Sequence, residues 1–158
     1  MPDLLDDDVR EFLEGGSSTI VGFVTADGVP FATRGWGSQI VGPAELRVLV
    51  GAGPLVAGGR GPTLAEPFAI AVTGADVRTL HSVQAKGVVV ALEPPTAEDL
   101  ERSARFCDEF FTAVRETDGI ERERMDRLVP ADLLACTVEV DELYDQTPGP
   151  GAGAKLSR

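Results

Sequence analysis

The stretch "STIVGFVTADGVPFATRGWGSQIV", residues 18–41, decides the fold. Its first part, 18–25, is rich in β-branched residues, which are typical of strands. The "ADG" that follows predicts a tight turn, in which Gly28 is free to take a positive φ. Residues 29–41 have the pattern of the returning strand. The stretch therefore predicts an antiparallel hairpin, to which "LRVLVG" at 46–51 adds a third strand after a turn at "GPAE".

The rest of the chain continues this pattern of strands. "FAIAVTG" at 68–74 and "LHSVQAKGVVVALE" at 80–93 predict two more strands, and "ACTVEVDEL" at 135–143 alternates like a final one. Closely spaced turn signals between strands are typical of an antiparallel meander or barrel. We expect a mainly β fold with helices (a β-barrel, α+β) of about six to seven antiparallel strands. Residues 17–93 would hold the barrel strands, and 134–142 the last strand.

Helices are predicted before the first strand and between the fifth strand and the last one. Residues 3–14 have apolar positions at helical spacing and end at a Gly-Gly pair. A second helical region, 96–129, has Thr96 and Asp99 in the pattern of an N-terminal cap and Gly119 as the end of the longer helix. We expect the apolar face of this longer helix to pack on the barrel or on a partner subunit, and its members are Leu100, Ala104, Cys107, Phe110, Phe111 and Val114.

Length and composition limit the class of protein. The chain has 158 residues, 43% of them hydrophobic, which fits a single domain with a packed core. A formal net charge of −12 argues against nucleic acid and anionic membranes as partners. No apolar run is long enough to span a bilayer, and the acidic first residues do not form a secretion signal, so we expect a cytoplasmic protein. Cys107 and Cys136 are predicted to be small buried residues, and one histidine is too few for a Cys/His zinc site.

The charge is distributed unevenly along the sequence. Residues 15–92 carry five bases against four acids, net +1, which leaves −13 for the remainder. This segment is therefore the part of the chain where an anionic ligand would meet least repulsion. It also contains Gly35, Gly37 and Gly87 inside predicted strands, where a glycine marks either a bulge or the close approach of a ligand.

The order of helix, strand meander, long helix, final strand and "TPGPGAG" tail, together with "DGVPFATRGWG" and "LHSVQAKG", resembles a known superfamily. It is that of the FMN-binding split barrels, and the closest resemblance is to the proteins named after pyridoxamine 5'-phosphate oxidase. The resemblance covers nearly the whole chain in element order, and its motifs are short. It implies an FMN site formed by Arg34, Gly35, Trp36, Gly37, Ser38, Val50, Gly51, His81, Ser82, Gln84 and Lys86.

The resemblance also implies roles for these residues. Lys86 and Arg34 would face the phosphate or the ribityl chain, Ser82 and Gln84 would donate hydrogen bonds, and Val50 and Gly51 would lie beside the isoalloxazine ring. Cationic and hydroxyl groups suit a phosphate, and an apolar surface suits a flat ring. Alternate strand positions share a face, so Ser82, Gln84 and Lys86 are expected to act together. Arg34, Trp36 and Ser38 are expected to share a face in the same way.

His81 stands where the family commonly has arginine, and a neutral imidazole binds phosphate less well than a guanidinium. Three functions remain open. The first is an FMN-dependent oxidoreductase acting on an unidentified small molecule. The second is a non-catalytic module of the same fold that holds FMN, a deazaflavin or, through His81, haem. The third is a ligand-free dimeric interaction protein. No residue stands out as a catalytic acid or base, and the arginine-x-histidine pair of the vitamin B6 phosphate oxidase is missing, so that reaction is not inferred.

We also expect a homodimer, because split barrels of this kind complete their flavin sites across a two-fold interface and the two-fold dimer is the commonest oligomer. The helix face with Phe110 and Phe111 is one candidate for the contact. The Pro/Gly-rich tail, 145–158, is another, through 147–156. It would be either disordered or a fixed loop laid over a partner.

Overall fold

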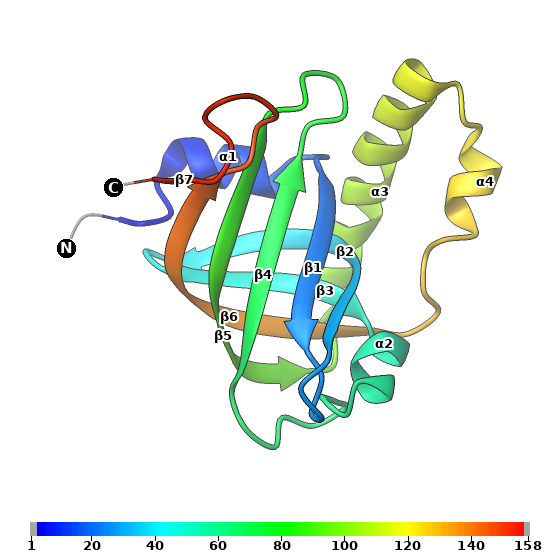
Figure 1. Ribbon diagram of the computed structural model, residues 1–158. Coiled ribbons are helices and arrows are strands. Elements are labelled where there is room, and N and C mark those ends of the chain that lie inside the picture. The colour runs from blue at the N-terminus through cyan, green and yellow to red at the C-terminus, as the bar shows by residue number, and fades with distance from the viewer. Residues whose placement is uncertain (1–2, 157–158) are drawn as a thin grey trace.

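The computed structural model describes residues 3–156 as one barrel with attached helices (Figure 1). The elements in chain order are α1 (Asp7–Glu14), β1 (Ser18–Val24), β2 (Pro30–Gly42), β3 (Glu45–Gly51), α2 (Ala52–Ala57), β4 (Phe68–Ala75), β5 (Ser82–Glu93), α3 (Ala97–Asp118), α4 (Arg122–Asp126), β6 (Leu133–Asp145) and β7 (Ala154–Leu156). Within this described part, no helix is long and apolar enough to cross a membrane.

Six of the strands close into an antiparallel barrel. Their order is β3-β2-β1-β4-β5-β6, and β6 pairs back with β3, so the barrel has no open seam between its first and last strands. The seventh strand, β7, pairs with the end of β6. The long helix α3 stands beside the barrel and precedes β6 in the chain (Figure 1). The predicted fold, a mainly β barrel with a helix at the start and a long helix before the last barrel strand, is confirmed.

The core lies inside the barrel, because side chains at alternate strand positions point inward. Val21, Val72, Ala85 and Leu143 are neighbours in register across β1, β4, β5 and β6, and all four are fully buried. Leu5, which precedes helix α1, and Val9 and Leu13 of the helix belong to the same cluster, together with other apolar residues. Both cysteines are buried and free, as the sequence predicts.

Helix α1 begins at Asp7, later than the predicted start at residue 3. The reason is the N-cap, since Asp6 accepts a hydrogen bond from the Val9 amide at 3.0 Å through its carboxylate. The predicted cap of α3 is present as a full capping box between Thr96 and Asp99, and Gly119 ends the helix in the left-handed conformation at φ 67°.

The buried face of α3 differs from the predicted one at its N-terminal half. Leu100 is 50% exposed and Ala104 is also exposed, while Asp99 and Ser103 are buried in their place. The helix turns its Asp99 side inward because that carboxylate pairs with Arg47 of β3. Further along, the prediction holds, and Phe106, Cys107, Phe110, Phe111 and Val114 form a second core cluster with Trp36 of β2.

The Arg47–Asp99 pair joins α3 to the barrel wall. Arg47 Nε and Nη2 donate to the two carboxylate oxygens of Asp99 at 2.9 and 2.6 Å, in a bidentate arrangement. Asp99 also accepts from the Thr96 amide at 2.8 Å, so one carboxylate caps the helix and holds the strand. Glu93 completes the cluster at 2.8 Å from Arg47, on the solvent side. This cluster sets the position of α3 relative to β2 and β3.

A bulge in β2 reverses the predicted side-chain pattern after Trp36. The register with β3 shifts between Gly35 and Ser38, and Gly37 takes a φ of +122° there. Trp36 is buried under α3, on the outside of the barrel, whereas Ser38 lies opposite the core residue Val48. The prediction that Arg34, Trp36 and Ser38 share a face is therefore wrong. Among residues 3–156, the hydroxyl of Ser38 is the one buried side-chain polar atom without a hydrogen-bond partner.

The Pro/Gly-rich tail is folded onto its own chain, as far as the structure describes it. Ala154, Lys155 and Leu156 pair with Asp145, Tyr144 and Leu143 of β6. The expectation of a disordered segment or a loop is therefore wrong for these residues, and 157–158 lie outside the described part of the chain. Strand β6 itself runs to Asp145, beyond the predicted end at 142.

Candidate functional site

The polar row that begins at His81 does not form one continuous cradle. His81 is exposed, and its Nδ1 lies 3.1 Å from the hydroxyl of Thr147. Its ring meets Phe12 of α1 edge-on, with the centroids 4.7 Å apart. Ser82 is buried, and its hydroxyl donates to the carbonyl of Leu80 at 2.9 Å. The Ser82 amide donates to Thr147 at 3.0 Å.

The next residue of the row, Gln84, is also engaged within the chain. Its amide nitrogen donates to Thr73 Oγ1 at 2.9 Å, and its amide oxygen accepts from Gln146 at 3.1 Å. The Gln146 backbone amide donates to the Ser82 carbonyl at 2.9 Å. The first part of the row therefore anchors the segment that follows β6, and Lys86 is the one member that stands apart from this role.

The glycines and the strand end in the predicted site are explained by packing within the barrel. A Cβ on Gly35 would lie 2.6 Å from a methyl group of Thr19, and one on Gly87 would lie 2.0 Å from the Glu139 carbonyl oxygen. Val50 is fully buried in the barrel core, and Gly51 is buried against Pro130. Close packing within the barrel therefore explains these glycines without the approach of a ligand. The side chain of Val50 is fully buried, so it is not accessible to a flavin ring.

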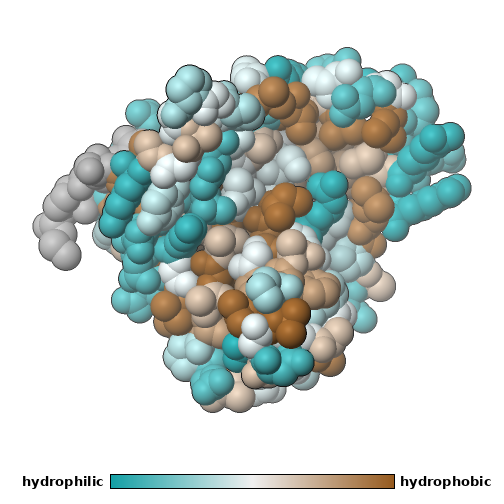
Figure 2. All heavy atoms as spheres, viewed as in Figure 1, coloured by the Kyte–Doolittle hydropathy of each residue, from teal (hydrophilic) through white to brown (hydrophobic). Residues whose placement is uncertain are grey.

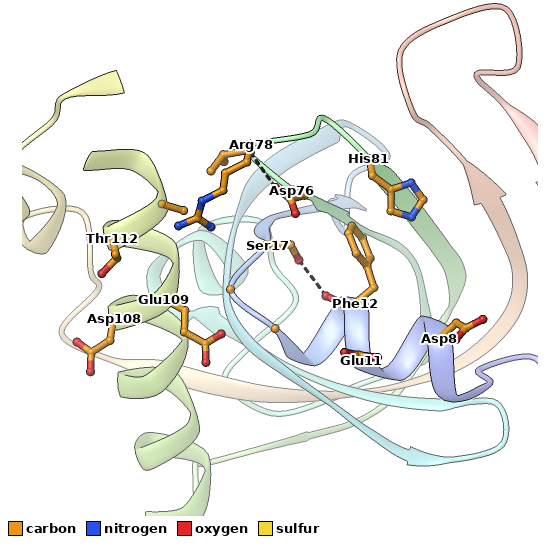
Figure 3. Close-up of a pocket in the computed structure, with 14 residues that line it drawn as sticks. Asp8, Glu11, Phe12, Ser17, Asp76, Arg78, His81, Asp108, Glu109 and Thr112 are labelled. Carbon is orange, nitrogen blue, oxygen red and sulfur yellow. Dashed lines mark hydrogen bonds between the residues drawn. The ribbon is translucent and has the colours of Figure 1, made fainter. Parts of the chain in front are cut away.

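One cavity is an acidic cleft of about 830 Å³ between α1, the β4–β5 loop and α3 (Figure 3). Five carboxylates line it against one guanidinium and one imidazole, and these charged and titratable residues are Asp8, Glu11, Asp76, Asp108, Glu109, Arg78 and His81. Arg78 is already paired with Glu116 at 2.5 Å. The cleft therefore repels anions, and it is a poor site for a phosphorylated cofactor.

The second cavity is a groove of about 700 Å³ on the outer surface of the barrel, which we call the outer-face groove. Its lining comes from five strands and comprises Gly22, Phe23, Val24, Pro30, Phe31, Ala32, Ala69, Ile70, Ala71, Lys86, Gly87, Val88, Asp141 and Glu142. Figure 2 shows apolar residues gathered on the lower half of this face, over β1 and β4. The groove thus presents a flat, mostly apolar surface with one cation, Lys86, and two carboxylates, Asp141 and Glu142.

The floor of the outer-face groove is made of small residues in register. Gly22 pairs with Ala32 on one side and with Ala71 on the other, and Ala71 pairs with Lys86. A Cβ on Gly22 would meet nothing within 4 Å, so this position opens directly into the groove. Small side chains at these outward positions leave room for a flat ligand to lie against the strands.

Two cations on the outer surface are free to bind an anion. Neither Arg34 nor Lys86 makes a side-chain hydrogen bond or a salt bridge to any residue among 3–156. Each lies over an aromatic ring, Arg34 at 5.9 Å from the centroid of Phe110 and Lys86 at 4.6 Å from that of Tyr144. Three steps across the sheet separate their strands, about 14 Å at roughly 4.8 Å a step, so the two cations do not bind the same phosphate from one chain.

Lys86 has acidic neighbours on β6. Glu142 accepts a short hydrogen bond from the Tyr144 hydroxyl and lies 3.3 Å from Nζ of Lys155. Both contacts lower the pKa of Glu142, the tyrosine more than the lysine, and the same carboxylate raises the pKa of Tyr144. Glu142 is therefore ionised near neutral pH. Its direct contacts are with Tyr144 and Lys155, and Lys86 acts on it only through its charge at longer range.

Comparison with other proteins concerns the fold alone. No family model and no curated protein matches the sequence. HupZ from Group A Streptococcus superposes with a TM-score of 0.53 at 10% identity, over 94% of this chain and 98% of that one. An F420 reductase gives 0.51 at 17% identity, over 85% and 94%. A protein of the pyridoxinephosphate oxidase family from Clostridium acetobutylicum, related to general stress protein 26 of B. subtilis, gives 0.47 at 12%, over 89% and 87%.

The chain is a split barrel. The likeness to HupZ and to the F420 reductase concerns the fold, and the barrel with helices that the sequence predicts is confirmed at that level. Sequence reasoning placed Lys86 in a ligand site but missed the small residues on which this split barrel builds its groove. The signal was present in outward-facing positions 22, 32 and 71, each a glycine or alanine inside a strand. These three positions become neighbours only through the pairing register of β1 with β2 and β4, which the sequence of a single strand does not reveal.

Proposed function

We propose that this split barrel binds a flavin, with flavin mononucleotide as the first candidate, in the outer-face groove and uses it in the oxidation or reduction of a small molecule. The observation that carries the proposal is Lys86, a cation without an ion-pair partner among the described residues, beside a flat floor of small side chains. The acidic cleft offers neither property. Bound FMN would supply the electron and hydride transfer, and the protein would position it.

The residues of the groove fit such a ligand. A phosphate monoester carries about −1.5 to −2 charge at pH 7 and is held by cationic donors. Lys86 supplies one such donor, and Gly22, Ala32 and Ala71 leave a surface against which a ring system can lie. Apolar lining with few polar groups is the usual composition of a cofactor site.

Haem fits the described residues less well. His81 is the single histidine, and it lines the acidic cleft, where carboxylates would repel the propionates of a haem. Its Nδ1 is also engaged with Thr147. We therefore place flavin ahead of haem as the ligand of this chain.

The phosphate role of Lys86 can be tested by replacing it with methionine. We expect FMN affinity to fall by about tenfold, because a charge-assisted contact to the phosphate is lost. Riboflavin, which lacks the phosphate, should bind wild type and variant alike. Flavin fluorescence quenching measures both, and Arg127→Met is the matched control, since it removes an exposed cation at the C-cap of α4 without an ion pair among residues 3–156.

The outcomes separate the hypotheses. Equal loss for FMN and riboflavin would mean that Lys86 supports the fold and not the phosphate. The visible spectrum of the purified protein adds a second check, with bands near about 375 and 450 nm for a flavin and a Soret band for haem. Binding of a deazaflavin with no affinity for FMN would move the proposal to that cofactor.

We further propose that the protein is a homodimer in which a second copy covers the outer-face groove. Phe110 and Phe111 are buried within their own chain, and Ala154–Leu156 of the tail pair with β6 of the same chain. The groove face instead exposes Ile20 and Phe31 at about two fifths of their surface. The chain has a net charge of −12, so two copies repel each other over most of their surface. On this face, the cations Arg34 and Lys86, which have no ion-pair partner among residues 3–156, would reduce that repulsion.

The dimer is checked by light scattering at micromolar concentration. Wild type should give twice the mass of one chain, and Phe31→Glu should give a monomer, because a buried unpaired carboxylate opposes association. Val56→Glu is the control, since Val56 is exposed to a similar degree on α2 and does not line the groove. A wild-type monomer would overturn the dimer, and a dimeric Phe31→Glu variant would move the interface elsewhere.

A further inference from the structure

Lys86 and Glu142 are directly paired residues that do not form a salt bridge. They lie opposite each other on β5 and β6, and side chains in such positions have Cβ atoms about 4.5–5.5 Å apart. A lysine and a glutamate in this arrangement are expected to form an ion pair. The ammonium of Lys86 instead lies over the Tyr144 ring, and no contact within salt-bridge distance joins it to Glu142.

The carboxylate of Glu142 is held by other partners. The Tyr144 hydroxyl donates to Glu142 Oε2, and Lys155 of β7 lies 3.3 Å from the same oxygen. Lys155 and Tyr144 are themselves opposite each other in the β6–β7 pair. The position of β7 therefore decides whether the second cation near Glu142 is Lys155.

Strand β7 is the least secured strand of the described chain. It has three residues and pairs on one side only, with β6. Ala154 and Lys155 are exposed, and Leu156 is half-buried against the core. Short edge strands with few buried contacts open at low free energy.

We propose that Lys155 is a positioning residue, which keeps Glu142 occupied and so leaves Lys86 free to bind the anionic group of a ligand in the outer-face groove. When β7 is displaced or Lys155 is lost, Glu142 turns to Lys86 and the groove loses its affinity for anions. This inference rests on the proposed function for the identity of the ligand. By linkage, a bound anion stabilises the docked position of β7.

The charges around the groove agree with this arrangement. Asp141 is exposed next to Glu142 and lines the same groove, so Lys86 would face two carboxylates if Lys155 were absent. With Lys155 docked, one of the two is neutralised. The lowered pKa of Glu142, caused first by Tyr144 and then by Lys155, shows that these partners stabilise its charged form.

The first test uses FMN binding with riboflavin as the matched ligand. Lys155→Met should weaken FMN binding by about tenfold and leave riboflavin unchanged. Adding Glu142→Gln to Lys155→Met should restore FMN affinity, because the competing charge is removed while an acceptor for Tyr144 is kept. A Lys155→Met protein with wild-type FMN affinity, or a loss that Glu142→Gln does not rescue, overturns the inference.

The second test needs no ligand, because Lys86 and Lys155 are the two lysines of the chain. Acylation of Lys86 by an amine-reactive ester, followed by mass spectrometry, reports how free its amine is. The rate should fall severalfold in Lys155→Met and recover in the double variant with Glu142→Gln. If wild type binds no flavin, the proposed function fails, while these rates still decide the inference. An unchanged rate at Lys86 overturns it.

Discussion

Replacing Gly22 with valine is expected to abolish flavin binding while the barrel stays folded. A Cβ at this position meets nothing within 4 Å, and the residue has no left-handed φ, so the backbone accepts a side chain. Valine also suits a strand better than glycine, and the variant should unfold at the same or a higher temperature. Its two methyl groups would occupy the floor between Ala32 and Ala71. We expect FMN affinity to fall by at least about 100-fold, which corresponds to about 2.7 kcal/mol.

The experiment measures binding and unfolding on the same protein. Riboflavin should be lost together with FMN, because the ring is excluded, which distinguishes this variant from Lys86→Met. Gly53→Ala is the control, since its added Cβ also meets open space but lies on α2, outside the groove. Flavin binding by the Gly22→Val protein at wild-type strength would show that the outer-face groove is not the site.

The second large effect concerns stability. Asp99→Asn should lower the free energy of unfolding by about 3–5 kcal/mol at pH 7, the scale for breaking a buried ion pair from one side. The side chain of Asp99 is 4% exposed and that of Arg47 is 15% exposed, so the guanidinium would lose its buried, bidentate partner and keep only the exposed Glu93. Urea denaturation measures the loss. Glu93→Gln, which removes the exposed partner of the same arginine, should cost less than about 1 kcal/mol.

This stability depends on pH in a defined direction. Hydrogen bonds from Arg47 hold the pKa of Asp99 at about 2, below the ordinary value of 3.8. Because the folded state favours the charged form, the contribution is complete above about pH 4 and is lost as the pH falls toward 2. Wild type and Asp99→Asn should therefore converge in stability at the acid end. A constant difference between them from pH 7 to pH 2 would contradict the assignment.

The elements of this fold could be predicted from local sequence, because their signals lie within a few residues of each other. A turn needs Gly28 at a position of positive φ, and the start of α3 needs Thr96 and Asp99 three residues apart. Strand alternation likewise depends on nearest neighbours. These signals determined the hairpins, the helix ends and the order of elements, and the order of elements is what made the split-barrel fold recognisable.

The site could be predicted only in part, because its geometry depends on residues that are distant in sequence. Lys86 was identified as a cation within a strand. Its neighbour Glu142 lies on β6, and Lys155, which neutralises the charge of Glu142, lies on β7. One extra residue in the bulge at Gly37 moved Ser38 to the opposite side of the sheet from its predicted one.

The sequence by itself determined which segments form strands and helices, and it determined that residues 15–92 hold few acids and a net charge of +1. Only the tertiary structure decided which cations of this segment stay free, since Arg47 and Arg78 find carboxylates far along the chain and Lys86 does not. It also decided that Gly22, Ala32 and Ala71 form one floor. The physical reason is that register across strands is set by closing the barrel around its core, and that closure depends on all six strands together.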